Sequence, residues 1–213
     1  MSKRLNSVTV STITVFIVMV LASIEPLEWS SYLLHQLGTL LFLAVMLGAY
    51  CYRKIGSRSY MFASLFLIIH IIGARYLYSY VPYDDWTQRL LGINLNQIFG
   101  WQRNMYDRLV HFSYGLLLLS AMVESSKSVF GIQSMKLLIA IALMINMSSS
   151  LLYELLEWGI ASTLSPEAAE AYNGQQGDIW DAHKDMALAL LGGLIAAGVI
   201  LFQTRTHQVA APK

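Results

Sequence analysis

Three carboxylates stand close together near the end of the chain, at Asp178, Asp181 and Asp185. On an α-helix they would share a sector of roughly 60°, because successive residues turn by about 100°. His183 would point away from that face. Acids that share one face beside a bilayer repel one another unless a cation, a proton or a basic partner lies among them. A divalent metal ion held by the three carboxylates is therefore our first hypothesis.

A second set of residues lies at the start of an apolar run in the middle of the chain. Asp107, His111 and Tyr114 are spaced i, i+4 and i+7, which places them within about 60° on one helix face. An Asp and a His one turn apart can bind a metal together, or the Asp can fix the imidazole tautomer for proton transfer. The alternative is that Asp107 caps the helix and His111 is an ordinary buried histidine.

The apolar run 135–158 contains a polar stripe. Asn146, Ser150, Glu154 and Glu157 would lie within roughly 80° of one another on a helix. Carboxylates inside a membrane segment are costly and usually face a bundle interior or a wet cavity. We therefore expect Glu154 to act with Asp107 and His111 as a catalytic group, whereas Glu157 can reach the membrane interface.

An earlier apolar run, 59–78, carries His70 and Arg75. His70 is a candidate for the same polar site, or a donor of a hydrogen bond between helices. Arg75 either extends toward the interface or supplies the counter-charge for the acids.

Composition defines the broad class. Of the 213 residues, 56% are hydrophobic and 13% are charged, which is typical of a protein that crosses the membrane several times. A net charge of +1 gives no reason to expect nucleic acid as a partner. A single cysteine, Cys51, excludes a disulfide framework and a cysteine-based zinc motif.

The elements that must position the polar residues are six apolar runs, predicted as membrane-spanning helices of one all-α domain over 1–213. Their ranges are 8–24, 32–52, 59–78, 107–123, 135–158 and 186–202. We expect the first to be an uncleaved helix, with a secretory signal as the alternative. The two longest loops are 79–106, with an interfacial piece at 90–101, and 159–177.

Orientation follows from the basic residues, which favour the cytoplasmic side. With both termini in the cytoplasm, nine of the fourteen bases fall on that side: Lys3, Arg4, Arg53, Lys54, Arg58, Lys127, Lys136, Arg205 and Lys213. In this topology all the candidate polar residues share one depth, near the outer face.

Four blocks of the sequence resemble the bacterial inner-membrane family typified by YjdF. They are His70-Ile-Ile-Gly-Ala-Arg-Tyr-Leu-Tyr78 followed by Val81-Pro82, Arg103-Asn-Met-Tyr-Asp-Arg-Leu-Val-His-Phe112, Tyr153-Glu-Leu-Leu-Glu-Trp158 and Gln176-Gly-Asp-Ile-Trp-Asp-Ala-His-Lys-Asp-Met186. The resemblance implies a multi-pass protein of the inner membrane and carries no known reaction. The polar positions alone are similar to VanZ-like proteins, which implies a role in the cell envelope.

Three functions remain open from the sequence. The first is an enzyme that uses a divalent metal on a lipid-linked or cell-envelope substrate, with His111 as acid or base. The second is a proton-coupled transporter, in which Glu154, His70 and His111 exchange protons. The third is a structural or partner-binding membrane protein whose polar residues hold its helices together.

Overall fold

The computed structural model describes residues 2–165, 169 and 172–210, and within these ranges every regular element is a helix. The helices are α1 (Ser2–Ala22), α2 (Trp29–Cys51), α3 (Ser57–Arg75), α4 (Tyr83–Leu91), α5 (Leu95–Phe99), α6 (Tyr106–Phe130), α7 (Met135–Ala161) and α9 (Asp181–Ala210). Five of them, α2, α3, α6, α7 and α9, are long and apolar enough to cross a membrane. The apolar part of α1, Ser7–Ala22, is shorter.

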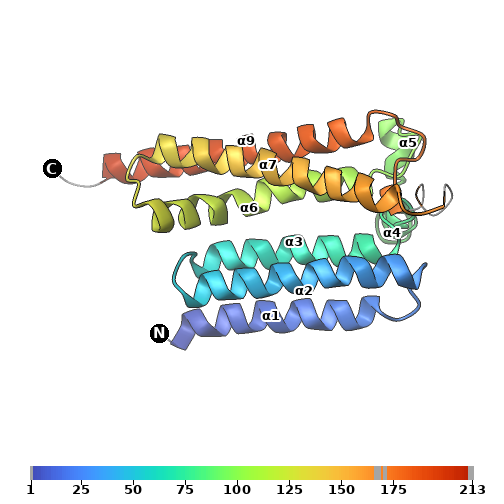
Figure 1. Ribbon diagram of the computed structural model, residues 1–213, viewed down its shortest axis with the longest axis horizontal. Helices are drawn as coiled ribbons and strands as arrows, with labels where there is room; N and C mark the ends of the chain where they lie inside the picture. The colour runs from blue at the N-terminus through green and yellow to red at the C-terminus, as the bar shows by residue number, and fades with distance from the viewer. Residues whose placement is uncertain (1, 166–168, 170–171, 211–213) are drawn as a thin grey trace.

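The long helices run side by side in two layers (Figure 1). Helices α1, α2 and α3 form one layer, and α6, α7 and α9 form the other, while packing of α3 against α6 joins the two. Helix α1 begins, and α9 ends, at one end of the molecule. Helices α4 and α5 lie at the opposite end, which we call the polar end because the candidate residues gather there (Figure 1).

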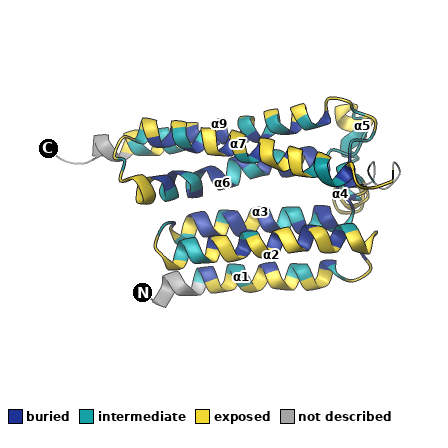
Figure 2. Ribbon diagram, viewed as in Figure 1, coloured by how far each residue is buried: buried dark blue, intermediate teal, exposed yellow. Residues whose placement is uncertain are grey.

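Large apolar side chains cover the outside of the bundle. Figure 2 shows exposed residues along the outward faces of the long helices, and many of these are leucines. Examples with more than half of their surface exposed are Leu37 and Leu41 on α2 and Leu152 and Leu156 on α7. Such a surface is unfavourable in water and suits the hydrocarbon of a bilayer.

Helices α6 and α9 approach each other at two glycines. A Cβ on Gly192 would collide with the carbonyl oxygen of Phe112 and lie 2.8 Å from the backbone nitrogen of Leu116. A Cβ on Gly115 would collide with the carbonyl oxygen of Ala189. Only glycine permits backbones this close, and the crossing brings the start of α6 beside the start of α9.

Several element boundaries differ from expectation, and three of the differences lie near the polar end. Helix α9 begins at Asp181 and not at 186, so Asp181 and Asp185 are helical while Asp178 precedes the helix. Helix α3 ends at Arg75 because Leu77 and Tyr78 take left-handed φ values of 49° and 56°. The loop 79–106 contains α4 and α5, and in the loop 159–177 positions 166–168 and 170–171 lie outside the described residues.

Candidate functional site

Arginines neutralise the acidic segment before and within α9. The Arg108 side chain, from the first turn of α6, donates from Nη2 to Asp181 Oδ1 at 2.5 Å and to Asp178 Oδ2 at 3.2 Å. Its Nη1 forms an ion pair with Asp185 Oδ1 at 2.5 Å. Arg103 adds a second donor to Asp181 Oδ1 at 2.6 Å. All three acids expected as metal ligands are thus engaged by guanidinium groups.

Asp178 has a further cationic partner. Lys184 Nζ lies 2.6 Å from Asp178 Oδ2, and this hydrogen bond lowers the pKa of the Asp178 carboxyl below its usual range. The lysine side chain is mostly exposed. Asp178 therefore lies at the solvent-exposed side of the cluster, and Asp181 and Asp185 are more deeply buried.

The loop before α9 is held by the segment before α6. Arg103 donates to the carbonyl oxygens of Gly174 and Gln175, each at 3.0 Å. Gln176 pairs with Asn104 twice: its Oε1 accepts from the Asn104 backbone N–H at 2.9 Å, and its Nε2 donates to the Asn104 carbonyl at 3.1 Å. These bonds fix where α9 enters the bundle.

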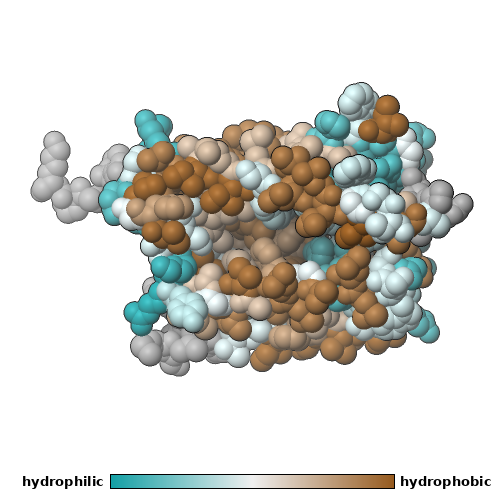
Figure 3. Space-filling view, in the orientation of Figure 1, coloured by the Kyte–Doolittle hydropathy of each residue, from teal (hydrophilic) through white to brown (hydrophobic). Residues whose placement is uncertain are grey.

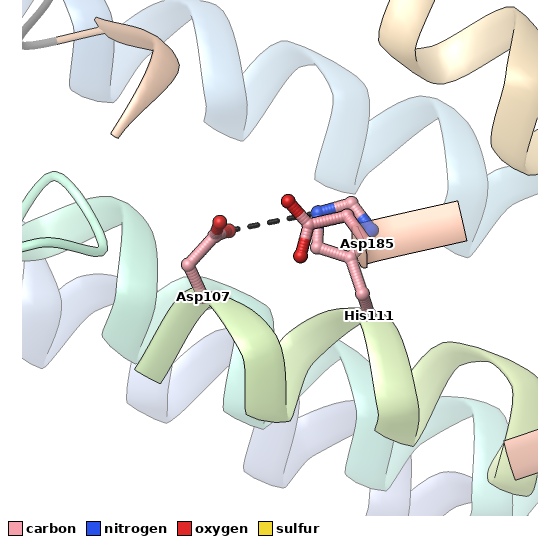
Figure 4. Close-up of side chains that lie close together, drawn as sticks. All are labelled: Asp107, His111 and Asp185. Carbon is pink, nitrogen blue, oxygen red and sulfur yellow. Dashed lines mark ion pairs between the residues drawn. The ribbon is translucent and has the colours of Figure 1, made fainter. Parts of the chain in front are cut away.

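His111 lies between two carboxylates on different helices. Its Nε2 is 3.6 Å from Asp107 Oδ1, one turn earlier on α6, and its Nδ1 is 3.7 Å from Glu154 Oε1 on α7. Figure 4 shows the Asp185 carboxylate of α9 close to the same imidazole. Glu154 is only 7% exposed, and its Oε1 has no hydrogen-bond partner in the described structure.

Three of these residues have the spacing of a metal site. Ligand atoms of Asp107, His111 and Asp185 all lie within 4.8 Å of one another. The 3.6 Å from His111 to Asp107 exceeds the usual hydrogen-bond length of about 3 Å. It is close to the separation of about 3.4 Å between two ligands of one tetrahedral metal ion. Of the three expected metal ligands, Asp185 belongs to this group.

A cluster of imidazole and phenol rings lies next to this site. His35 of α2 lies 6.0 Å from the ring centre of His70 and 5.1 Å from those of Tyr78 and Tyr172. His70 Nδ1 and the Tyr78 hydroxyl are 2.9 Å apart. Burial raises the pKa of Tyr172 to about 12 and raises that of Tyr78 well above its usual value, so both phenols stay protonated. His70 thus joins a ring cluster rather than the carboxylates.

The remaining expected residues are spread around the site. Arg75 donates to the carbonyl oxygens of Leu21 and Ala22 at the end of α1, away from the acids. The Tyr114 hydroxyl bonds with Ser149 of α7. Glu157 is partly buried on α7, and His183 is exposed with its ring against Trp180.

Arg103, Arg108 and His35 are the partners that the sequence interpretation missed. Arg108 stands beside Asp107, and Arg103 lies in one of the four blocks that carry the family resemblance. The sequence interpretation gave neither arginine a partner. His35 is a lone histidine in an apolar run, the same signal that singled out His70.

The described chain is all-helical, with five membrane-length helices, an apolar exterior and buried charges at one end. These features define a multi-pass integral membrane protein. Comparison with known families is more specific: the chain belongs to the family described as "Predicted membrane protein (DUF2238)", whose model matches residues 7–206.

The family resemblance found in the sequence blocks is confirmed. The chain is 27% identical over 199 residues to the inner membrane protein YjdF of Escherichia coli (strain K12), which covers 92% of this chain and 88% of that protein. No solved structure matches. The chain is accordingly a multi-pass protein of the inner membrane.

Proposed function

We propose that this protein binds a divalent transition-metal ion through Asp107, His111 and Asp185, and uses it on a lipid-linked or cell-envelope substrate. The observation that supports this best is the convergence of the three side chains, from α6 and α9, to within 4.8 Å. One imidazole with two carboxylates is a ligand set suited to Zn²⁺ or another first-row ion and leaves a position open for substrate.

Glu154 supports the same proposal. A histidine that binds a metal through one nitrogen commonly donates its other N–H to a carboxylate, which fixes the tautomer. Glu154 Oε1 lies 3.7 Å from His111 Nδ1, with no other hydrogen-bond partner in the described structure. Asp178 and Asp181 then have a positioning role, since they hold Arg103 and Arg108 in place.

A bound metal ion would polarise a phosphoryl or carbonyl oxygen of the substrate. The protein side chains supply the rest. Glu154 would orient His111 by accepting its Nδ1–H, and the buried Arg108 balances the charge of Asp185. The site lies at one end of membrane-length helices, where a membrane-bound substrate can reach it.

We further propose six spans with both termini in the cytoplasm, so that the polar end faces outward. The apolar stretch Ser7–Ala22 of α1 packs along α3 and would form the sixth span. The basic residues Arg53, Lys54 and Arg58 lie at the end opposite α4 and α5, which agrees with a cytoplasmic position.

Metal content of the purified full-length protein tests the proposal. We expect about one transition-metal ion per chain, measured by mass spectrometry, and its loss in His111→Gln and Asp185→Asn. The matched control is Asp178→Asn, which removes an acid of the same cluster outside the ligand group and should retain the metal. Size-exclusion profiles check that each variant folds.

Two results would contradict this assignment. One is wild-type protein without metal after growth in medium supplemented with zinc, manganese and iron. The other is metal lost in Asp178→Asn but kept in His111→Gln, which would place the ion among Asp178, Asp181 and Asp185 instead.

A proton-coupled transporter is the second candidate, and one observation favours it. His111 has a carboxylate near each ring nitrogen, Asp107 at 3.6 Å and Glu154 at 3.7 Å, an arrangement that can pass a proton between helices. Proton flux into vesicles that contain the protein and a pH dye, abolished by Glu154→Gln, would support transport. If the metal-loaded protein shows no proton flux, the transporter function is excluded.

A further inference from the structure

Contacts between side chains run from α2 to α7 across the inside of the molecule. Phe42 of α2 lies 5.9 Å, between ring centres, from Phe66 of α3, and Phe66 lies 5.6 Å from Tyr114 of α6. Tyr114 in turn bonds with Ser149 of α7. The four helices thus form an arc with α2 and α7 at its ends, and these two helices have at most marginal contact within the described residues.

The surface is hollowed where the arc is open. Figure 3 shows a hollow between the two layers, with mostly hydrophobic residues around its rim. The flanking helices carry exposed leucines such as Leu37 and Leu41 on α2 and Leu152 and Leu156 on α7. We call this hollow the α2–α7 cleft. We take as its expected floor the residues whose contacts cross from α2 to α7, namely Phe42, Phe66, Tyr114 and Ser149. Its rim is apolar and belongs to helices of membrane-spanning length, so the cleft opens toward lipid.

Polarity increases along the cleft toward the polar end. His70 and His111 each lie about one turn from a floor residue, and His35 lies two turns from Phe42. The Nδ1 of His35 faces the Ser31 carbonyl at 2.6 Å and must donate to it, so Nε2 is an acceptor. This buried Nε2, like Glu154 Oε1, has no partner in the described structure. The apolar groups at mid-membrane depth would suit the acyl chain of a lipid, and the unpaired polar groups farther out would suit its head group.

We propose that the α2–α7 cleft admits a membrane lipid with a phosphate-bearing head group from the side. Its acyl chain would lie over Phe42, Phe66 and Tyr114, and its head group would reach His111 and Glu154. The inference rests on the proposed function, because a metal ion beside these carboxylates is what would attract an anionic phosphate. Relative to the proposed function, the added claim is that the substrate is a lipid and that it enters the site from within the bilayer.

Photolabelling of the reconstituted full-length protein tests this entry route. The vesicles contain phosphatidylethanolamine and phosphatidylglycerol, and part of the phosphatidylglycerol carries a diazirine halfway along an acyl chain. After irradiation, peptide mass spectrometry locates the adducts. We expect adducts on Phe66 and Tyr114 of the floor as well as on outward residues such as Leu155, which is 51% exposed.

A glycine pair on α2 provides the blocking variant and its control. Gly38 lies three residues after His35 and four before Phe42, hence on the same side of the helix. A Cβ at Gly38 or at Gly48 meets nothing within 4 Å. Gly38→Trp should fill the cleft and abolish the floor adducts while the Leu155 adducts persist. Gly48→Trp, which points about 120° away from Phe42, should leave both unchanged.

Adducts confined to outward residues in the wild type would overturn the proposal, as would floor adducts that survive Gly38→Trp. If the ligand were a soluble phosphate, no acyl chain would enter the cleft, and the adducts would be confined to outward residues. Metal content is measured on the same samples, so the two proposals fail separately. If the protein contains metal but shows no floor adducts, the metal site stands and the lipid entry route is wrong. If floor adducts form without bound metal, only the metal chemistry is wrong.

Discussion

Arg108 lies among three carboxylates, and its charge decides whether they can remain buried together. Its side chain and that of Asp181 are each 7% exposed, and that of Asp185 is 3% exposed. Arg108→Gln would leave the buried Asp185 carboxylate without its arginine, while Asp181 keeps Arg103, so we expect the free energy of unfolding to fall by about 3–5 kcal/mol. Unfolding in mixed detergent micelles measures this change.

Lys184→Gln is the matched control for Arg108. The Lys184 side chain is 54% exposed, and its pair with Asp178 should contribute less than about 1 kcal/mol. The double variant Arg108→Gln, Asp185→Asn should recover part of the loss, because it also removes the anion that lost its arginine partner. Equal effects of the two single variants would show that Arg108 is not the group that stabilises the acids.

How far these residues were predictable depends on their separation in the chain. Asp107 and His111 are one helical turn apart, so their proximity follows from spacing alone. The pair Arg103 and Asp181 joins residues that are 78 positions apart. No periodicity encodes such a contact, since it depends on how α6 and α9 cross. The sequence therefore indicated acids that need neutralising, and assigned the counter-charge to Arg75 or a metal.

At the scale of elements, the crossing of α6 and α9 positions the site. Gly192→Ala would press a methyl group against the Phe112 carbonyl and the Leu116 nitrogen, neither of which can move without shifting α6. We expect a loss of about 2 kcal/mol in stability and, because Asp185 moves with α9, reduced metal content. Thermal unfolding and metal analysis of the same preparation measure both.

Gly198→Ala is the comparison for this prediction. It lies on the same helix, and a Cβ there meets nothing within 4 Å. Alanine should be neutral or stabilise α9 by up to about 1 kcal/mol, since it has the higher helix propensity. A Gly192→Ala protein as stable as Gly198→Ala would mean that the backbones do not approach as described. The sequence alone could not distinguish Gly192 from Gly198, because only the structure shows which of them lies against α6.

Helix α2 begins with an acid-dependent cap. The Glu28 carboxylate accepts from the backbone N–H groups of Ser30 at 2.9 Å and Ser31 at 2.6 Å. Together with the Ser30 hydroxyl, these bonds lower the pKa of Glu28 from 4.5 to about 2. Glu28→Ala should cost about 1 kcal/mol at neutral pH.

The pH dependence of that cost follows from the direction of the shift. The folded state holds Glu28 ionised more strongly than the unfolded state, so its stabilisation is complete above pH 4.5 and is lost as pH falls toward 2. Unfolding of wild type and Glu28→Ala across this range should show the difference between them shrinking. Glu28→Gln, which retains an acceptor but no charge, should differ from wild type less than Glu28→Ala does at neutral pH. A difference independent of pH would rule out the charged cap.

At the scale of the whole molecule, hydropathy predicted the helical class because a bilayer demands long apolar runs. It left the ends of the helices imprecise, since polar residues such as Asp181 and Asp185 continue a helix when arginines pair with them. The arrangement of two layers with a cleft between α2 and α7 was not predictable, because both helices are apolar on several faces. Which apolar face packs and which faces lipid depends on partners distant in sequence.

The orientation of the molecule in the membrane can be tested with one native residue. Cys51 is exposed at the end of α2, at the opposite end from α4 and α5. With the termini in the cytoplasm, a membrane-impermeant maleimide should label Cys51 in inverted vesicles and not in intact spheroplasts. Ile179, 83% exposed at the polar end, gives the converse probe as Ile179→Cys in a Cys51→Ser background. Labelling of Ile179→Cys only in inverted vesicles would reverse the topology and place the metal site and the cleft's polar end on the cytoplasmic side.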